Sequence, residues 1–309
     1  MSDLLRRGFF PAFVTALAAW AAWAADGGPA RLLGLDGPAV EGVGLVAAIL
    51  VGWSAVAAAE RVLPFRRDWN RPHGDVPSDV AFLVTGATVH SLAQPLLGLA
   101  GAALLRAWQG PGGGGLWPTS WPLLAQLALA LVVAELGHWL FHKVSHEHDL
   151  VWRVHAAHHA APRLYWLNAT RFHPVDLFAL IACQVLPLLA LGIGAPALAA
   201  YTIFTSVYGQ LQHGNVDLDT RALDGVFSTP ALHRWHHADE ARIANANYGA
   251  VLIVWDRIFG TFRDPGRPFD GRVGLDGLPG FPAGWVDQLL SPVRWAEAHR
   301  PPEGHRSDA

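Results

Sequence analysis

The stretch "WPLLAQLALALVVAELGHWLFHKVSH", residues 121–146, is an apolar run that ends in histidines. Its first part, 121–141, is long enough for a helix that crosses a bilayer, which needs about 20 apolar residues. His138, His142 and His146 follow at intervals of four and therefore share one stripe of such a helix. Ionisable side chains at membrane depth are costly and usually functional. The stretch therefore predicts a membrane-spanning helix with a functional site at one end.

The rest of the chain has the same membrane character. Of its 309 residues, 52% are apolar and only 15% are charged, and the mean hydropathy is +0.25; a typical soluble domain has about 25% charged residues. Further apolar runs occupy 9–25, 42–59, 81–105 and 177–212. The last is interrupted by "GIGAP" and is either two tight spans or a hairpin that dips in and returns. We predict an all-α, polytopic integral membrane helical bundle with a histidine-rich helical cap.

The loops between these runs predict the orientation. Six arginines precede the first run or follow the second: Arg6, Arg7, Arg61, Arg66, Arg67 and Arg71. The loop after the third run carries only Arg106. Because positive residues stay in the cytoplasm, we expect the amino terminus, the loop near residue 66 and everything after His142 to be cytoplasmic. The first run is then a retained span, and the metal site faces the cytoplasm.

Charge and cysteine content exclude several classes of protein. The net charge is −3 with a pI near 6.6, so there is no basic surface and nucleic acid is not an expected partner. The single cysteine, Cys183, excludes a disulfide within the chain, a thiolate zinc finger and a protein-bound iron–sulfur cluster. The "GPGGGG" at 110–115 lacks the Lys-Ser/Thr of a phosphate loop and is predicted to be a flexible turn. Any metal must be held by nitrogen or oxygen.

Histidines supply that nitrogen, because 12 of the 16 lie between His138 and His237. On a helix, His155 of "HAAHH" shares a face with both later histidines, while the adjacent pair splays to two sides of the stripe. "HRWHH" repeats this spacing, which suits two metal ions side by side. Nine histidines are predicted metal ligands: His138, His142, His155, His158, His159, His213, His233, His236 and His237. His146 is less favoured because it lies one turn further into polar sequence.

The ligand type narrows the choice of metal. Neutral imidazole suits zinc, copper, iron and nickel. The histidines are too many for one ion and would oversupply tetrahedral zinc. With four or five nitrogens per metal, an octahedral ion such as iron keeps a position open for dioxygen. The sequence therefore favours a centre of two iron ions.

The order of the motifs resembles the fatty acid hydroxylase and sterol desaturase superfamily of membrane-embedded di-iron oxidases. The resemblance covers roughly 123–262 and rests on "HWLFH", "HAAHH", "ATRFHP", "LHRWHHADE" and "NYGAVLIVWDRIFGTF". The family's ligand positions match the nine histidines above, His213 corresponding to one often found between the boxes. On this basis residues 1–118 are N-terminal transmembrane spans and loops, 119–265 a fatty acid hydroxylase-like catalytic domain, and 266–309 a polar or interfacial tail.

The resemblance implies dioxygen-dependent oxidation of an unactivated C–H bond in a sterol, fatty acyl chain or related lipid, by hydroxylation or desaturation. Arg171 and Asp217 are the candidate catalytic residues. Arg171 is expected to anchor a carboxylate or the loops of the site, and His173 to support the site rather than to bind metal. Asp217 lies four residues after His213, where some family members have a second histidine, which leaves its role as a ligand open. Tyr165, Trp166, Asn168 and Tyr248 could line the substrate path or anchor the chain at the interface.

Partners follow from what the sequence lacks. It has no Rossmann fingerprint, flavin motif or cluster-binding cysteines, so the electrons must come from a ferredoxin, cytochrome or flavoprotein reductase. Abundant Ala, Gly and Arg beside a single Lys143 indicate a GC-rich bacterial genome, and hence the bacterial inner membrane. The alternative is a non-enzymatic membrane metal-binding or transport protein, but only His90 lies midway along a span. A zinc hydrolase would need H-E-x-x-H and a nucleophile, which the sequence does not offer.

Overall fold

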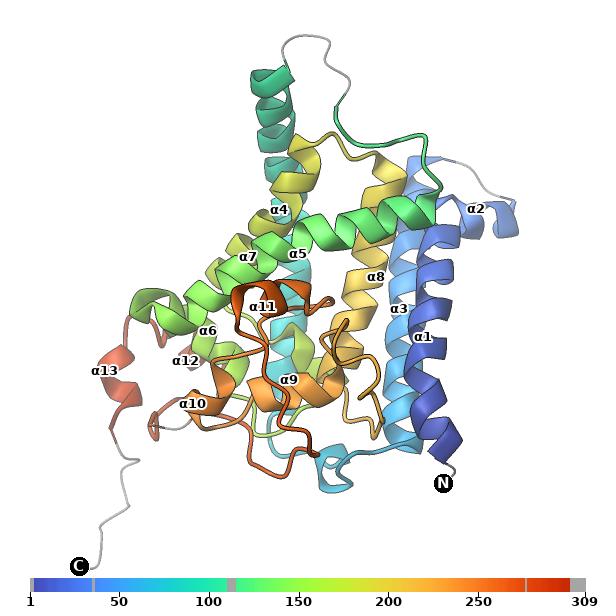
Figure 1. Ribbon diagram of the computed structural model, residues 1–309. Helices are drawn as coiled ribbons and strands as arrows, with labels where there is room; N and C mark the ends of the chain where they lie inside the picture. Colours follow the sequence, from blue (N-terminus) through green and yellow to red (C-terminus); the bar gives the residue numbers. More distant parts are fainter. Residues whose placement is uncertain (1–2, 35–36, 110–114, 276, 301–309) are drawn as a thin grey trace, which may run out of the picture.

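The structure, a computed structural model, describes residues 3–34, 37–109, 115–275 and 277–300. The predicted turn at 110–114 and the end of the tail at 301–309 lie outside this description. Within it the fold is helical, without a named strand (Figure 1). The long elements are α1 (Asp3–Ala25), α3 (Pro38–Val62), α4 (Val76–Gln109), α5 (Leu123–Glu147), α7 (Pro174–Ala190) and α8 (Ala195–His213). The shorter ones are α2 (Gly28–Leu33), η1 (Asp68–Asn70), α6 (Asp149–His159), η2 (Trp166–Thr170), α9 (Pro230–His236), α10 (Ala241–Ala244), α11 (Val254–Phe259), α12 (Trp285–Leu290) and α13 (Trp295–Ala298).

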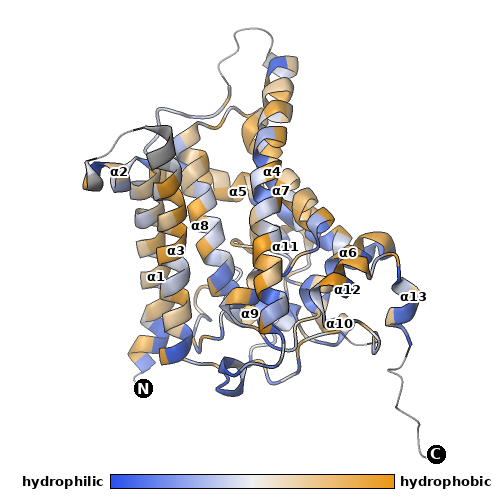
Figure 2. Ribbon diagram, turned by 180° about the vertical axis from the view of Figure 1, so that it is seen from behind, coloured by the Kyte–Doolittle hydropathy of each residue, from blue (hydrophilic) through white to orange (hydrophobic). Residues whose placement is uncertain are grey.

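Four of the described helices are long and apolar enough to cross a membrane: Asp3–Ala25, Gly42–Val62, Val76–Trp108 and Leu123–Glu147. Apolar residues predominate along these helices, whereas polar residues are more frequent toward one end of the bundle (Figure 2). Val46 and Leu50 of α3 and Leu92, Leu96 and Leu99 of α4 are all exposed. Exposed leucine and valine on long helices are stable against lipid, not water. The prediction of an all-α polytopic membrane protein is confirmed.

The apolar run at 177–212 forms two helices, α7 and α8, joined by a tight turn at 191–194. α8 packs against α1 and α3, whereas α7 packs between α4 and α5. The turn is fixed by the backbone N–H groups of Leu116 and Trp117, which both donate to the carbonyl of Leu191 at 2.9 Å. The chain therefore goes out along α7 and returns along α8, so that His173 and His213 lie at the same end.

α5 and α7 approach each other closely because α5 carries Gly137. A Cβ atom at this position would lie 1.9 Å from the carbonyl oxygen of Cys183 in α7. Small residues at helix contacts are the usual way in which membrane helices pack backbone to backbone. This contact brings the end of α5 against the start of α7, where the site is built.

The cap consists of α6, α9, α10, α11 and the loops between them, and it covers one end of the bundle (Figure 1). The amino terminus lies at that end, because Arg6 donates to Asp217 at 2.6 Å. The loop after α3 lies there too, since the N–H of Asp217 donates to the carbonyl of Leu63 at 2.7 Å. The three regions predicted to share one face are therefore together. That this face is cytoplasmic stays a prediction.

The C-terminal segment packs onto the cap and α4. Trp285 donates from Nε1 to Thr85 Oγ1 at 3.1 Å. Trp295 is 9% exposed and packs with Ala156 and Leu278. Leu278, Trp295 and Ala298 of this segment are therefore buried in one apolar core with Ala156 of α6.

Candidate metal centre

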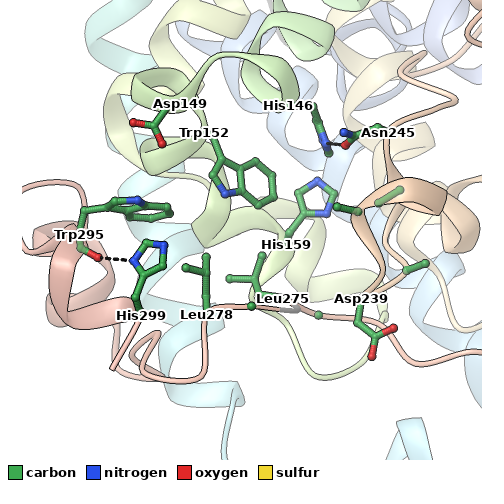
Figure 3. Close-up of a pocket in the computed structure, with 15 residues that line it drawn as sticks. His146, Asp149, Trp152, His159, Asp239, Asn245, Leu275, Leu278, Trp295 and His299 are labelled. Atoms are coloured by element: carbon green, nitrogen blue, oxygen red, sulfur yellow. Dashed lines mark hydrogen bonds between the residues drawn. The ribbon is translucent and has the colours of Figure 1, made fainter. Parts of the chain in front are cut away.

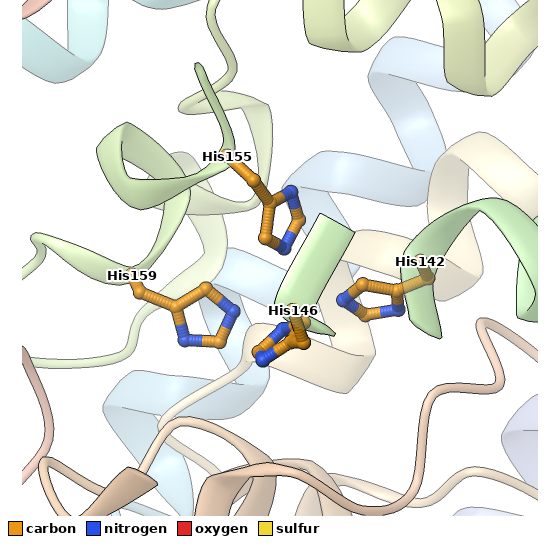
Figure 4. Close-up of side chains that lie close together, drawn as sticks. All are labelled: His142, His146, His155 and His159. Carbon is orange, nitrogen blue, oxygen red and sulfur yellow. The ribbon is translucent and has the colours of Figure 1, made fainter. Parts of the chain in front are cut away.

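The first group of histidines, called site 1 here, lies where α5 meets α6 and consists of His142, His146, His155 and His159 (Figure 4). One ring nitrogen of each lies within 4.8 Å of the others. Each helix contributes two residues four apart, which share one face. His148 interrupts the helix between them with an extended backbone conformation, so that α6 turns back toward α5.

The second group, called site 2 here, draws its ligands from three helices. His158 comes from α6, His213 ends α8, and His233 and His237 come from α9 and its C-cap. Their nitrogens also lie within 4.8 Å of one another, and all four side chains are buried. Pro230 begins α9 after Thr229, whose hydroxyl accepts a hydrogen bond from the N–H of Leu232.

The two sites adjoin. His159, His236 and His237 form a third group with nitrogens within 4.8 Å of one another, and two of its members already belong to site 1 and site 2. The adjacent residues His158 and His159 point to different sites. This is the arrangement that the spacing of "HAAHH" predicts for two ions side by side.

The outer nitrogen of most of these rings is held by an oxygen atom. The partners of Nδ1 are the Tyr248 carbonyl for His142 (2.7 Å), the Ala246 carbonyl for His236 (2.8 Å), the Arg171 carbonyl for His158 (3.2 Å) and the Asp176 carboxylate for His155 (2.9 Å). Carbonyl and carboxylate oxygens only accept, so each Nδ1 carries the proton. The lone pair of each ring then lies on Nε2, which is the atom available to a metal.

This assignment leaves Nε2 lone pairs that a metal ion would satisfy. Nε2 of His142 lies 3.0 Å from Nε2 of His236, and because both rings have their proton on Nδ1, two lone pairs face each other. Nε2 of His146, His155 and His159 is buried without a hydrogen-bond partner among the described residues. Buried polar atoms in proteins nearly always have partners. The donor set therefore fits metal ions that prefer imidazole nitrogen.

Burial keeps the rings neutral. Desolvation, followed by repulsion from neighbouring imidazoles, lowers the pKa of His158, His159, His233 and His237 well below the usual range. Burial lowers the pKa of His236 to about 3. At neutral pH all five side chains are therefore in the form that binds metal.

Two further side chains orient the ligands. Asp176, 1% exposed, accepts from His155, and Asn168 Oδ1 lies 3.2 Å from Nδ1 of His213. Asp176 lies in the first turn of α7, which Pro174 begins and the His173 side chain caps. Sequence reasoning did not assign Asp176 to the site, because it stands at the polar edge of an apolar run. The pattern "HPVD", which is typical of the start of a helix, indicates that Asp176 lies in a first helical turn close to a histidine motif.

The structure brings His146 into site 1, whereas His138 is in none of the three groups. His138 Nδ1 lies 2.6 Å from the side-chain amide of Gln184 instead. The sequence prediction favoured His138. His146 was less favoured because it lies one turn further into polar sequence, but α5 continues to Glu147 and carries the histidine stripe that far. The remaining predicted ligands are all in the groups.

The two predicted catalytic residues have different positions. Arg171, 1% exposed, donates from Nε to Asp79 at 2.7 Å, and its carbonyl holds His158. It thus anchors a carboxylate and a loop of the site, as expected. Asp217 is paired with Arg6, and none of its hydrogen bonds in the described part of the chain reaches a histidine. His173 caps α7 and belongs to no group.

A cavity of about 310 Å³ connects site 1 with the outside of the cap (Figure 3). It reaches His146 and His159, and Trp152, Asn245, Trp295 and His299 are among its walls. The four ligands of site 2, in contrast, are all buried. Access from the cap therefore leads to site 1.

A membrane helical bundle whose cap brings together two groups of four histidines has the ligands for metal ions within a membrane protein. The family model "Fatty acid hydroxylase" matches residues 127–261. Ornithine lipid hydroxylase OlsE of Rhizobium tropici is 36% identical over 252 residues, which cover 77% of this chain and 72% of that protein. Alkylglycerol monooxygenase of Danio rerio is 30% identical over 47% of this chain and 31% of its own length. Delta(7)-sterol 5(6)-desaturase erg3B of Aspergillus fumigatus is 30% identical over 47% of this chain and 42% of its own. No solved structure matches.

The chain belongs to the fatty acid hydroxylase and sterol desaturase superfamily. The predicted family and the predicted class, a membrane oxidoreductase, are confirmed.

Proposed function

We propose that the chain oxidises C–H bonds of a membrane lipid with dioxygen, using two iron ions and electrons from an external donor. The observation that carries the proposal is the pair of Nε2 lone pairs of His142 and His236, which face each other at 3.0 Å. Four nitrogens in site 1, four in site 2 and His236 between them support a count of two ions. We assign His146 to site 1 in place of His138.

The relatives support hydroxylation of a polar lipid. The match to the ornithine lipid hydroxylase covers most of both chains, whereas the matches to the sterol desaturases cover less than half of each. The proposed substrate is therefore an acylated polar lipid, and the proposed product carries one added hydroxyl group. In the balanced reaction, C–H, dioxygen, two electrons and two protons give C–OH and water.

The residues of the chain contribute in three ways. Iron bound at the two sites would supply activation of dioxygen and abstraction of hydrogen. The buried neutral imidazoles would hold the ions without adding negative charge, and the oxygens that accept from Nδ1 of His142, His155, His158 and His236 leave Nε2 of these rings for the metal. Leu140 and Val144 are exposed on α5 beside His142 and His146, which supports approach of a lipid chain from the bilayer.

An electron-transfer protein is the proposed partner, and the bacterial inner membrane with the cap in the cytoplasm is the proposed location. The relative from Rhizobium tropici supports a bacterial origin. The transport alternative has no similar support, since His90 bonds to the Gly86 carbonyl of its own helix at 2.9 Å.

Lipid mass spectrometry tests this function. The wild-type gene and a His236→Ala variant are expressed in a host that lacks the gene, and whole-cell lipids are compared. We expect a polar lipid that gains one oxygen atom with the wild type only. A change of minus two hydrogens would instead establish desaturation. Unchanged lipids in cells whose purified enzyme holds iron and receives electrons would refute the proposal.

A further inference from the structure

One short loop supplies the outer hydrogen-bond partners of three histidines. Asn245 Oδ1 lies 3.1 Å from Nδ1 of His146, the Ala246 carbonyl 2.8 Å from Nδ1 of His236, and the Tyr248 carbonyl 2.7 Å from Nδ1 of His142. These histidines come from α5 and α9, far apart in the sequence. Loop 245–252 is therefore the element that orients them together.

Two buried carboxylates hold this loop in place. Asp256, 0% exposed, accepts the N–H of Tyr248 on Oδ1 at 2.8 Å and that of Gly249 on Oδ2 at 2.9 Å. Glu135, 3% exposed, accepts the N–H groups of Ala250 and Val251. A carboxylate that accepts two amides restrains the peptide planes between them, and with them the direction of the carbonyls.

The backbone between the carbonyls has a special conformation. Asn247 has φ of 57° and is the one non-glycine residue with positive φ in the described parts of the chain. Asparagine tolerates this left-handed region better than most residues. Its side chain exchanges two hydrogen bonds with the backbone of Arg263, at 2.8 and 2.9 Å. The turn at Asn247 allows Ala246 and Tyr248 to present their carbonyls to different rings.

We propose that loop 245–252 is a positioning element for the metal ion at site 1, and that Asp256 and Glu135 act through it. The inference rests on the metal centre proposed above. The loop fixes His142 and His146 of site 1 as Nδ1–H tautomers, together with His236, whose Nε2 lies 3.0 Å from that of His142. Each Nε2 is then available to the ion. Two of the site 2 ligands have other partners, Asn168 and the Arg171 carbonyl. A change that loosens the loop should therefore lower the metal affinity of one site and leave that of the other unchanged.

Asp256→Asn is the first test, because an amide can accept only one of the two N–H groups and its own NH₂ opposes the other. Asn245→Leu is the second; Asn245 is exposed, so this variant should fold. Asn245→Asp keeps the acceptor and serves as its conservative match. Gln126→Leu removes the acceptor of Trp117 at the far end of α5 and controls for general destabilisation.

The measurement is a titration of metal-free full-length protein in detergent with cobalt(II) alone, whose visible spectrum reports each site. Removal of such outer partners typically weakens metal affinity about 10- to 100-fold. We expect this loss at one of two binding events in Asp256→Asn and Asn245→Leu, and none in Asn245→Asp or Gln126→Leu. If Asp256→Asn does not fold, the difference in cobalt affinity between Asn245→Leu and Asn245→Asp tests the proposal.

Wild-type affinity at both positions in Asn245→Leu would overturn the role of the loop and leave the metal centre intact. A wild-type chain that binds no metal would overturn the metal centre itself. The two failures are thus distinguishable without measuring enzyme activity.

Discussion

Site 1 and site 2 each consist of four histidines, but the two sites draw them from different helices. The ligands of site 1 lie between residues 142 and 159 on the successive helices α5 and α6. Those of site 2 lie between residues 158 and 237 on α6, α8 and α9. The ligands of site 1 therefore come from two helices that are adjacent in the sequence, whereas those of site 2 come together only when α6, α8 and α9 pack against one another.

The surroundings of the two sites differ as well. Site 1 opens to a cavity and has a carboxylate, Asp176, behind one of its rings. All four ligands of site 2 are buried, and two of its rings are backed by the neutral oxygens of Asn168 and Arg171. Two sites with four histidines each therefore differ in their access to solvent and in the charge behind their rings. We expect metal at site 1 to exchange with the solution faster than metal at site 2.

The largest expected effect comes from removing a ligand of the open site. His146→Ala should lose one metal ion and reduce lipid oxidation more than about 100-fold, since the ligand itself is removed and not only its outer partner. The matched variant two positions earlier on the same helical stripe, His138→Ala, should keep both ions. Metal analysis of the two purified variants checks this. Loss of an ion in His138→Ala and none in His146→Ala would reverse the assignment.

A smaller effect should follow when only the charge behind site 1 is removed. Asp176→Asn keeps the shape of the side chain but not its negative charge, and should weaken metal binding at site 1 about 10- to 100-fold. The affinity of site 2 should stay the same. Competition with a chelator of known affinity measures both constants. Equal weakening of the two sites would contradict the separation between them.

Acid should destabilise the metal-free protein through the buried histidines. Their folded pKa values lie below that of a free histidine, and His236 falls to about 3, so the unfolded chain takes up protons first. Stability is then complete above the unfolded pKa of about 6.5 and is lost as the pH falls toward 3, by at most about 1.4 kcal/mol per histidine and pH unit. Thermal unfolding of the apoprotein between pH 8 and pH 5 checks the sign. A melting temperature that rises on acidification would contradict it.

The smallest effect is expected at Asp217, which the sequence had associated with His213. Its carboxylate pairs with Arg6, and both side chains are about one third exposed, at 33% and 38%. Pairs of this kind contribute less than about 1 kcal/mol. Asp217→Asn should therefore retain both metal ions and lower the stability only slightly. A lost ion at site 2 would restore Asp217 as a ligand or its support.

The histidine spacing was enough to predict that α5 and α6 carry metal ligands, but not which two histidines of α5 belong to site 1. H-x-x-x-H identifies a face of a helix, yet the choice between His138 and His146 depends on where α5 ends. Hydropathy ends the span at residue 141, because Lys143, Glu147 and His148 are polar. The helix nevertheless continues to Glu147, and its last turns pair Lys143 with Glu147 and join His142 and His146 to loop 245–252.

Long-range partners could not be predicted from spacing. Nothing in the sequence says that the Tyr248 carbonyl faces His142, or that Asp176 faces His155. Glu135 did carry a signal, because a carboxylate inside an apolar run must have a buried partner. Its partner is the backbone of loop 245–252; the motif "NYGAVLIVWDRIFGTF" marks this segment as typical of the family but does not indicate which side chain its N–H groups bond to.

The number of metal ions per chain tests the central claim most directly. Wild-type protein, His155→Ala from site 1 and His213→Ala from site 2 are purified with iron, and the iron is counted by mass spectrometry against the protein concentration. We predict two ions in the wild type and one in each variant, with different Mössbauer spectra for the two variants. A single ion in the wild type, or two ions in both variants, would contradict the existence of two separate sites.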